Sequence, residues 1–323
     1  MKHIPKSTYG IQLNHTFTFQ DLRTIIPYFE ELGISDVYAS PIFKARKGSM
    51  HGYDVVDPTQ INPELGTEDD FSKLSDELKK ANMGWLQDIV PNHMAYDSQN
   101  EILMDVLENG PYSQYAHFFD IQWKPHYSGM NEKILAPFLG TFFGKCLENG
   151  KIQLNYDEGG FSIHYFDHKF PVRIDSYNRV IMHHLRKLRG TLTTEHPDYI
   201  KLLGVLYVLK NIPTNEESTN RYEQITFVKR MMWELYQRNP QFNEFINENI
   251  RDFNGKPGEP ESYSLLNELL NEQFYRLAFW KVGTEEINYR RFFYVNELIS
   301  LRTEAEDVFE NIHAKLFQWI RDN

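Results

Sequence analysis

The feature that most constrains the fold is an alternation of strand-like and helix-like segments near the start of the chain. Runs rich in β-branched and aromatic residues lie at 8–13, 36–40 and 85–90. Between them, apolar residues recur at helical spacing over 18–32 and 67–78. Strands that alternate with helices through short connections are typical of right-handed parallel βαβ units. The sequence therefore predicts an α/β fold built on a parallel sheet.

Each of the two predicted helices begins with the same local signal. Thr18 precedes Asp21 by three residues, and Thr67 precedes Asp70 by the same spacing. A hydroxyl at the N-cap and an acidic residue three positions later can satisfy each other's free backbone amides. We expect both helices to start at these threonines, and the second helix to end at Gly84.

The pattern changes beyond residue 95. Alternating runs flank a turn at Asp157–Gly160 and predict a β-hairpin near 151–166. Residues 173–285 are predicted to be mostly helical, with the clearest helices at 221–236 and 264–281. A final helix at 308–320 carries one apolar face, which needs a sheet to cover it.

Composition excludes several classes of protein. The chain has 34 Lys and Arg against 45 Asp and Glu, a net charge of −11, and lacks the basic block that tracks nucleic-acid phosphates. Its longest apolar run, Leu202–Leu209, is far short of the roughly 20 residues that cross a bilayer. We expect a cytoplasmic protein that binds neither nucleic acid nor membrane.

The single cysteine, Cys146, is expected to be a small buried apolar residue.

Polar side chains stand at the end of the third predicted strand, where Asp88, Asn92 and His93 follow an apolar run. Functional groups in parallel αβ folds gather beyond the C-terminal ends of the strands. A structural interpretation is also open, because Asp88 could cap a backbone amide and Asn92 could form an Asx turn.

A second polar cluster lies in the loop after the second strand. Gly52 permits a close backbone approach, and His51, Tyr53 and Asp54 place hydrogen-bonding and stacking groups beside it. Loops that follow adjacent parallel strands meet at one edge of the sheet. The two clusters together therefore predict a pocket.

These residues belong to motifs that resemble a known family, and the matching segments are spread over nearly the whole chain. They are Pro5–Leu13, His51–Pro58 (HGYDVVDP), Asn62–Gly66, Asp88–Ala95 (DIVPNHMA), Asp105–Pro111, Tyr115–Asp120, Glu272–Ala278 and Glu286–Phe293 (EINYRRFF). The chain resembles the N-terminal part of the maltooligosyl trehalose synthases, members of the α-amylase superfamily (glycoside hydrolase family 13).

The resemblance implies a (β/α)8 TIM barrel that is incomplete in this chain. Residues 1–94 would form its first three β/α units. Residues 95–286 would form a large, mainly helical subdomain inserted after strand three. Residues 287–323 would be the return segment and the helix that leads to a fourth strand. Open edges of such a sheet would pair with the C-terminal remainder of the barrel or with another copy of the chain.

The resemblance also implies roles for the polar clusters in binding a maltooligosaccharide. Tyr53 would stack under the glucose ring at the cleaved bond, and His51 and His93 would hydrogen-bond its hydroxyls. Asp88 would orient this set, with Asp54 beside it. Asn92 matches a position that ligates calcium in many α-amylases, but the synthases are not generally regarded as calcium enzymes, so no metal and no cofactor are expected.

Cleavage of a glycosidic bond with retention of the anomeric configuration needs two carboxyl groups about 5 Å apart across that bond. The superfamily places them at the ends of strands four and five, and none of these carboxylates can be assigned here. Glu297, Glu304 and Glu306 lie near a predicted helix start, where a capping or dipole role is the better interpretation. The chain alone is therefore expected to be inactive.

The implied reaction of the full-length protein is an intramolecular transglucosylation, which converts the reducing-end α-1,4 linkage of a maltooligosaccharide to α,α-1,1. A vestigial maltooligosaccharide-binding fragment and a hydrolytic α-amylase relative remain as alternatives. Two positions depart from the family, because Gly10 replaces an arginine and Tyr294 replaces an aspartate.

Overall fold

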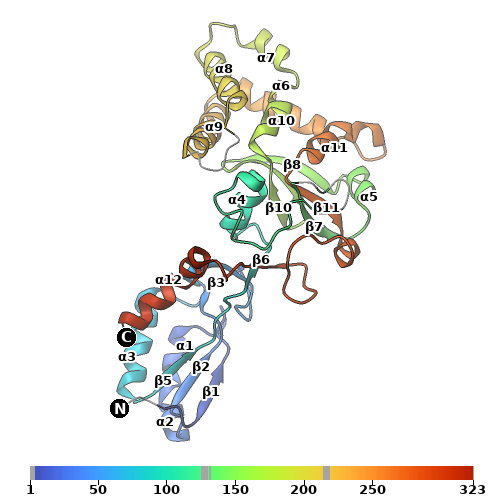
Figure 1. Ribbon diagram of the computed structural model, residues 1–323. Helices are drawn as coiled ribbons and strands as arrows, with labels where there is room; N and C mark the ends of the chain where they lie inside the picture. The colour runs from blue at the N-terminus through green and yellow to red at the C-terminus, as the bar shows by residue number, and fades with distance from the viewer. Residues whose placement is uncertain (1–3, 125–129, 131, 214–218, 323) are drawn as a thin grey trace. The chain divides into compact units, whose positions relative to one another are not determined.

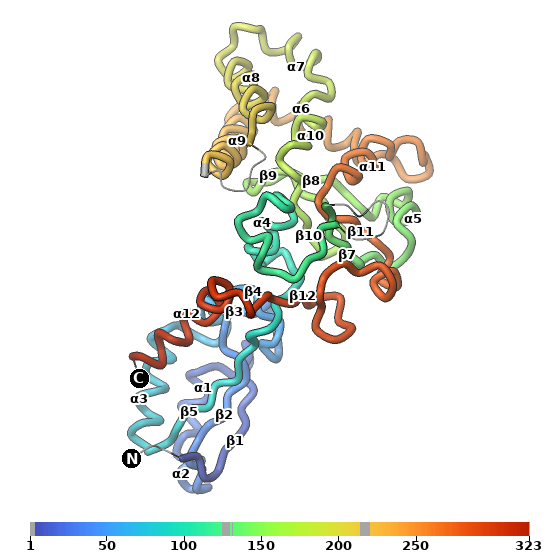
Figure 2. Tube along the Cα trace, viewed as in Figure 1, coloured from blue at the N-terminus to red at the C-terminus, as the bar shows by residue number. Residues whose placement is uncertain are grey.

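The computed structural model describes residues 4–124, 130, 132–213 and 219–322. The chain divides into two compact units, each described by itself (Figures 1 and 2). Unit 1 comprises Met1–Glu101, Phe118–Asp120 and Arg290–Asn323, and unit 2 comprises Ile102–His117 and Ile121–Tyr289.

Unit 1 is built on a parallel sheet of three strands, as the alternation of segments predicts. The strands are β1 (Thr8–Ile11), β2 (Asp36–Ala39) and β5 (Gly84–Gln87), with β2 in the centre (Figure 1). The third strand ends earlier than the predicted Val90, so Asp88 follows it directly. The backbone amide of Asp88 still donates to the carbonyl oxygen of Ala39, at 3.0 Å.

One face of this sheet is covered by helices. These helices are α1 (Phe19–Thr24), α2 (Ile26–Leu32) and α3 (Glu68–Lys80). Val37 and Ala39 of β2 point into the apolar core with side chains from these helices, and both are fully buried. Alternate residues of a strand point to opposite faces. Tyr38 therefore lies on the other face, where it is 45% exposed.

We call that other face the open face, and define it by Gly10, Tyr38 and Leu86. The register of the three strands pairs Gly10 with Tyr38 and Tyr38 with Leu86, so the three residues form one row across the sheet. Leu86 is 38% exposed. A Cβ on Gly10 would lie 3.8 Å from Cδ1 of Tyr38, an ordinary contact distance, so the sheet leaves room for a side chain there.

The predicted helix starts of unit 1 are confirmed. The Thr18 side chain accepts from the backbone amide of Asp21, whose carboxylate accepts in return from the backbone amide of Thr18. Thr67 forms the same reciprocal cap on α3. The predicted end at Gly84 is wrong, because α3 stops at Lys80 and Asn82 makes the left-handed turn (φ +52°) that leads into β5.

Two small antiparallel pairs complete unit 1. They are β3 (Phe43–Ala45) with β4 (Val55–Ile61), and β6 (His93–Ala95) with β12 (Leu298–Ser300).

The last helix of the chain, α12 (Glu306–Asp322), is confirmed and packs on β4. Its predicted apolar face is only partly buried: Ile312 is covered, whereas Phe309 and Ile320 remain 40% and 64% exposed. Trp319 of this helix stacks on Phe43, with ring centroids 5.3 Å apart.

Unit 2 contains the predicted hairpin and three further strands that the sequence pattern missed, β7, β10 and β11. The hairpin is β8 (Ile152–Asp157) and β9 (Gly160–Tyr165), and β10 (His168–Pro171) extends it to three antiparallel strands. A parallel pair, β7 (Ile134–Leu139) and β11 (Tyr275–Phe279), lies in the same unit.

The rest of unit 2 is mostly helical, as predicted. The helices that begin in or near this unit are α4 (Glu101–Asn109), α5 (Phe143–Glu148), α6 (Tyr177–Met182), α7 (Leu185–Thr191), α8 (Pro197–Lys210), α9 (Thr219–Arg238), α10 (Pro240–Phe253) and α11 (Ser264–Asn271). Cys146 of α5 is fully buried, as expected. Within the described residues, none of the helices combines the length and the apolar character that a membrane span requires.

The predicted helix at 264–281 is wrong in its second half. Helix α11 ends at Asn271, and residues 275–279 form the strand that pairs with β7. Tyr275 and Leu277 are buried in this pairing. Pairing with a strand far away in the sequence therefore overrides the local helical spacing.

Candidate functional site

The loop between β3 and β4 brings most of the predicted site residues to the end of the parallel sheet. Gly52 has φ +76°, and a Cβ built on it would lie 2.5 Å from the carbonyl oxygen of Pro41. Its amide donates to Oγ of Ser49 at 3.1 Å. The loop can pass this close to the backbone after β2 only because residue 52 has no side chain.

Asp88 joins two tyrosines at the end of β5. Its Oδ2 accepts a hydrogen bond from the Tyr53 hydroxyl at 2.5 Å and another from the Tyr38 hydroxyl at 3.0 Å. The hydrogen bond to Asp88 is the main reason why the pKa of Tyr53 rises to about 12, and it raises the pKa of Tyr38 as well. Asp88 thus hydrogen-bonds both phenol hydroxyls, and the role predicted for it in orienting the sugar-binding side chains stays a prediction.

The aromatic rings of this group remain accessible. Tyr53 is 42% exposed, and the side chain of His51 is 51% exposed with its ring centroid 5.9 Å from that of Tyr53. Exposed aromatic faces, held rigid and bordered by hydroxyls and a carboxylate, suit the apolar face and the hydroxyl rim of a sugar ring. We call Tyr38, His51, Tyr53 and Asp88 the tyrosine cluster.

Asp54 and His51 also hold the loop together. The Ser49 hydroxyl donates a short hydrogen bond to the Asp54 carboxylate. The ring of His51 accepts at Nδ1 from the backbone amide of Tyr53, at 3.0 Å. The predicted contact of Asp54 with substrate is untested, and its carboxylate supports the loop that presents Tyr53.

His93 is buried rather than presented to solvent, with 3% of its surface exposed. Its Nε2 lies 3.1 Å from the carbonyl oxygen of Tyr53, and its Nδ1 lies 2.8 Å from Oδ1 of Asn92. Burial lowers the pKa of the imidazole. The ring packs on Phe292 at 4.3 Å between centroids. In this arrangement His93 positions the backbone of Tyr53, and contact with a sugar hydroxyl would require one of these hydrogen bonds to open.

The three glutamates near the start of α12 have structural contacts. Glu297 pairs with Arg46 at 3.0 Å, and Glu304 lies 3.5 Å from Arg302. Glu306 occupies the first turn of α12, where a negative charge is favoured by the helix dipole. The place of Glu306 agrees with the dipole interpretation, whereas Glu297 and Glu304 contact arginines.

Tyr38 is the member of the tyrosine cluster that the sequence analysis missed. The signal was present, because Tyr38 alternates with two apolar residues in β2 and so points to the face opposite the core. A tyrosine on that face, one strand away from Asp88, could have been grouped with it.

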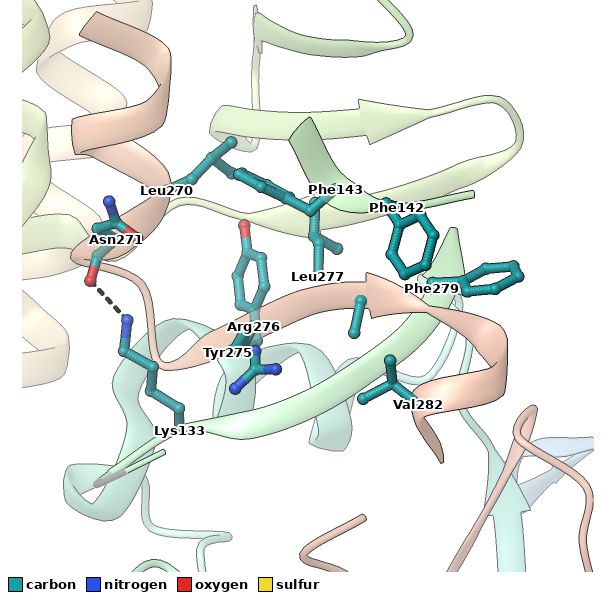
Figure 3. A pocket seen from close by; sticks show the side chains of 11 residues that line it. Lys133, Phe142, Phe143, Leu270, Asn271, Tyr275, Arg276, Leu277, Phe279 and Val282 are labelled. Carbon is teal, nitrogen blue, oxygen red and sulfur yellow. Dashed lines mark hydrogen bonds between the residues drawn. The ribbon is translucent and has the colours of Figure 1, made fainter. Parts of the chain in front are cut away.

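Two cavities lie away from the tyrosine cluster. A cavity of about 590 Å³ in unit 1 is lined by α3, β5 and α12, with Trp85 and Trp319 in its wall. A cavity of about 290 Å³ in unit 2 lies beside β11 (Figure 3). There the Lys133 ammonium donates to the Asn271 carbonyl oxygen at 2.5 Å, and burial lowers its pKa (Figure 3).

Comparisons with known proteins agree with the resemblance. The family model for the catalytic domain of alpha-amylase matches residues 18–172. A putative maltooligosyl trehalose synthase of Mycobacterium tuberculosis is 42% identical over 142 residues, which is 42% of this chain and 18% of that protein. Alpha-amylase 2 of Dictyoglomus thermophilum is 40% identical over 84 residues, 26% of this chain and 14% of that protein.

Solved structures match almost the whole chain. A glycosyltrehalose synthase is 31% identical with a TM-score of 0.63, and covers 96% of this chain and 31% of its own. A maltooligosyl trehalose synthase is 28% identical with a TM-score of 0.64, and covers 98% of this chain and 30% of its own. The chain thus spans less than a third of the length of these relatives. It is related to the maltooligosyl trehalose synthases of the α-amylase superfamily.

Proposed function

We propose that the tyrosine cluster of unit 1 binds a glucosyl unit of a maltooligosaccharide. The observation that carries this proposal is that Tyr53 and Tyr38 share one oxygen of Asp88 while both residues remain over 40% exposed. Two fixed aromatic rings beside a carboxylate offer both stacking and hydrogen bonding to one sugar. The names of the related proteins support α-linked glucose oligomers as the ligand class.

We propose further that the parallel sheet of unit 1 corresponds to the first three strands of a (β/α)8 barrel. In that arrangement the row of Gly10, Tyr38 and Leu86 would face the barrel interior, and the tyrosine cluster would lie at the C-terminal ends of the strands, where such barrels hold their active sites. The parallel register and the helix-covered opposite face support this assignment.

For a full-length protein, the proposed reaction is the intramolecular transglucosylation that converts the reducing-end α-1,4 linkage to α,α-1,1. The 323-residue chain alone is proposed to bind without cleaving. The carboxylate of Asp88 is engaged by two tyrosine hydroxyls and that of Asp54 by Ser49, so neither stands ready as a nucleophile or acid.

The test is a calorimetric titration of the chain with maltopentaose and with its β-1,4-linked isomer cellopentaose, followed by product analysis. We expect maltopentaose to bind, cellopentaose to bind more weakly, and neither sugar to be changed. Release of glucose or maltose would favour a hydrolytic α-amylase relative. A non-reducing product would show that this chain already holds the catalytic groups, and absence of binding would overturn the proposal.

A further inference from the structure

A second group of side chains, in unit 2 and unrelated to the tyrosine cluster, has the composition of a metal site. His183 and His184 follow α6, and Asp252 lies in the last turn of α10. Their ligand atoms all lie within 4.8 Å of one another. Nε2 of His184 is 2.8 Å from Oδ2 of Asp252, and Nε2 of His183 is 3.1 Å from the same oxygen.

These separations are close to those of ligands around one small cation. Zn²⁺ binds imidazole nitrogen and carboxylate oxygen at about 2.0–2.2 Å, so neighbouring ligands of a tetrahedral site lie about 3.3 Å apart. Small rotations of the two rings would open the contacts on Asp252 to that spacing. The ring centroids of His183 and His184 are 4.0 Å apart, so both imidazoles already face one side.

The backbone at this turn is what makes two adjacent imidazoles converge. His184 adopts a left-handed conformation, with φ +52° and ψ +16°. Few non-glycine residues do so, and such outliers persist only where the surroundings enforce them. Successive side chains in a helix or a strand point in different directions. The left-handed residue instead turns the ring of His184 to the oxygen that His183 already contacts.

Buried contacts fix this turn against α10. Asn249 is fully buried one turn before Asp252, and its side-chain amide donates to the carbonyl oxygens of Val180 and His183, both at 2.9 Å. Lys187 of α7 pairs with Glu248 of α10 at 2.5 Å. The ligand set is therefore tied to α10 by the buried Asn249 and, at the surface, by the Lys187–Glu248 pair.

The electrostatics of the turn favour a cation. The C-terminal end of a helix carries partial negative charge, which disfavours a carboxylate and attracts a positive ion. Asp252 stands at that end of α10. The neighbouring charges are neutralised elsewhere, because Arg251 pairs with Glu244 at 2.6 Å and Glu248 pairs with Lys187.

We propose that His183, His184 and Asp252 bind a divalent transition-metal ion of the Zn²⁺ class, with water in the remaining position. Each imidazole would give the lone pair of Nε2 to the metal and carry its proton on Nδ1. Two nitrogen ligands and one carboxylate suit Zn²⁺, Co²⁺ or Ni²⁺ rather than Mg²⁺ or Ca²⁺, which prefer oxygen. The ion would tie the α6–α7 turn to α10, independently of any sugar bound in unit 1.

The test is a calorimetric titration of tag-free, chelator-treated chain with ZnCl₂. We expect one Zn²⁺ per chain, and a loss of affinity of at least about tenfold in His184→Gln and in Asp252→Asn. The matched controls are His15→Gln, an exposed histidine in unit 1, and Glu234→Gln, a carboxylate of α9 that pairs with Arg238, and both should bind as the unaltered chain does.

A second measurement covers the case in which a variant does not fold. Co²⁺ added to the unaltered chain should give the intense visible absorption of a tetrahedral ion, and one equivalent of Zn²⁺ should abolish it, whereas excess Mg²⁺ should not. Circular dichroism checks that each variant is folded. The proposal is overturned if the unaltered chain binds no Zn²⁺ and gives no such spectrum, or if folded His184→Gln and Asp252→Asn bind as tightly as the controls.

Discussion

The two units place their polar groups in opposite ways. Unit 1 sets Asp88 at the end of a strand with two tyrosines that are over 40% exposed. Unit 2 buries its charges in pairs: the carboxylate of Glu108 is 11% exposed and lies 2.7 Å from the ammonium of Lys229. The tyrosine cluster is open to a ligand, whereas the Glu108–Lys229 pair is enclosed by the fold. Substitution of a charged residue should therefore have a larger effect on stability where the residue is buried than where it is exposed.

The largest effect is expected from Lys229→Met in unit 2. This change leaves the Glu108 carboxylate buried and unpaired, which should lower the free energy of unfolding by about 3 kcal/mol at pH 7. Burial raises the pKa of Glu108, and removal of Lys229 should raise it further, because the lysine's charge and hydrogen bond oppose the effect of burial. The loss should therefore be full above that raised pKa and shrink as the pH falls through it. Urea unfolding at several pH values measures both the loss of stability and its dependence on pH.

The control for Lys229→Met is Lys73→Met on α3. Lys73 pairs with Asp69 at 2.5 Å, but the two side chains are 54% and 72% exposed. Breaking this exposed pair should change the free energy of unfolding far less than Lys229→Met does. Equal losses in the two variants would remove the distinction between buried and exposed charges.

A smaller effect is expected from Gly52→Ala in unit 1. The new methyl group would lie 2.5 Å from the carbonyl oxygen of Pro41, and the left-handed backbone disfavours any side chain. Gly33→Ala is the matched control, because φ is +74° there and nothing lies within 4 Å of the added Cβ. Gly33→Ala should cost about 1 kcal/mol, and Gly52→Ala about 1–2 kcal/mol more.

Urea unfolding compares the two glycine variants, and calorimetry with maltopentaose shows which of them disturbs the tyrosine cluster. Only Gly52→Ala should weaken sugar binding, since only that loop presents Tyr53. If Gly33→Ala weakened binding as much, the loop would not be what positions the ring.

Local signals predicted much of unit 1. The reciprocal caps at Thr18 and Thr67 involve residues three positions apart, so the sequence alone specifies them. Strand β11 could not be predicted in this way. Its residues have helical spacing, and only pairing with β7, more than a hundred residues earlier, makes them extended. The left-handed residue His184 is likewise set by packing against α10 rather than by a glycine.

The sequence indicated which residues lie together in the candidate site more than how they are arranged. The resemblance grouped Asp88 with Tyr53, and the two side chains are joined by a hydrogen bond. The predicted contact of His93 with a sugar hydroxyl stays untested, and its imidazole is buried with both ring nitrogens near protein oxygens. Burial of a residue at the start of a loop depends on distant residues such as Phe292, which no local pattern reveals.

The smallest effect concerns the titration of Tyr53. The hydrogen bond to Asp88 raises its pKa to about 12, so the folded chain holds the phenol proton more firmly than the unfolded chain. The stability from this hydrogen bond should be complete below about pH 10, the ordinary tyrosine pKa, and lost as the pH rises through 12. Ultraviolet difference titration against Tyr53→Phe isolates the signal.

Asp88→Asn should move the titration of Tyr53 to lower pH, because the amide carries no negative charge. Asp57→Asn is the control, since the Asp57 carboxylate accepts from the backbone amide of Thr59 at 2.8 Å and contacts neither tyrosine of the cluster. If Tyr53 titrated at the same pH in the unaltered chain, in Asp88→Asn and in Asp57→Asn, then Asp88 would not hold the ring.

The most direct measurement is the affinity for maltopentaose of Tyr53→Ala in unit 1 compared with Tyr207→Ala, which removes a 72% exposed tyrosine from α8 in unit 2. Loss of one stacked ring should weaken binding about tenfold in Tyr53→Ala. Tyr207→Ala should bind as the unaltered chain does. Equal affinity in the two variants, with both folded, would contradict a sugar site at the tyrosine cluster.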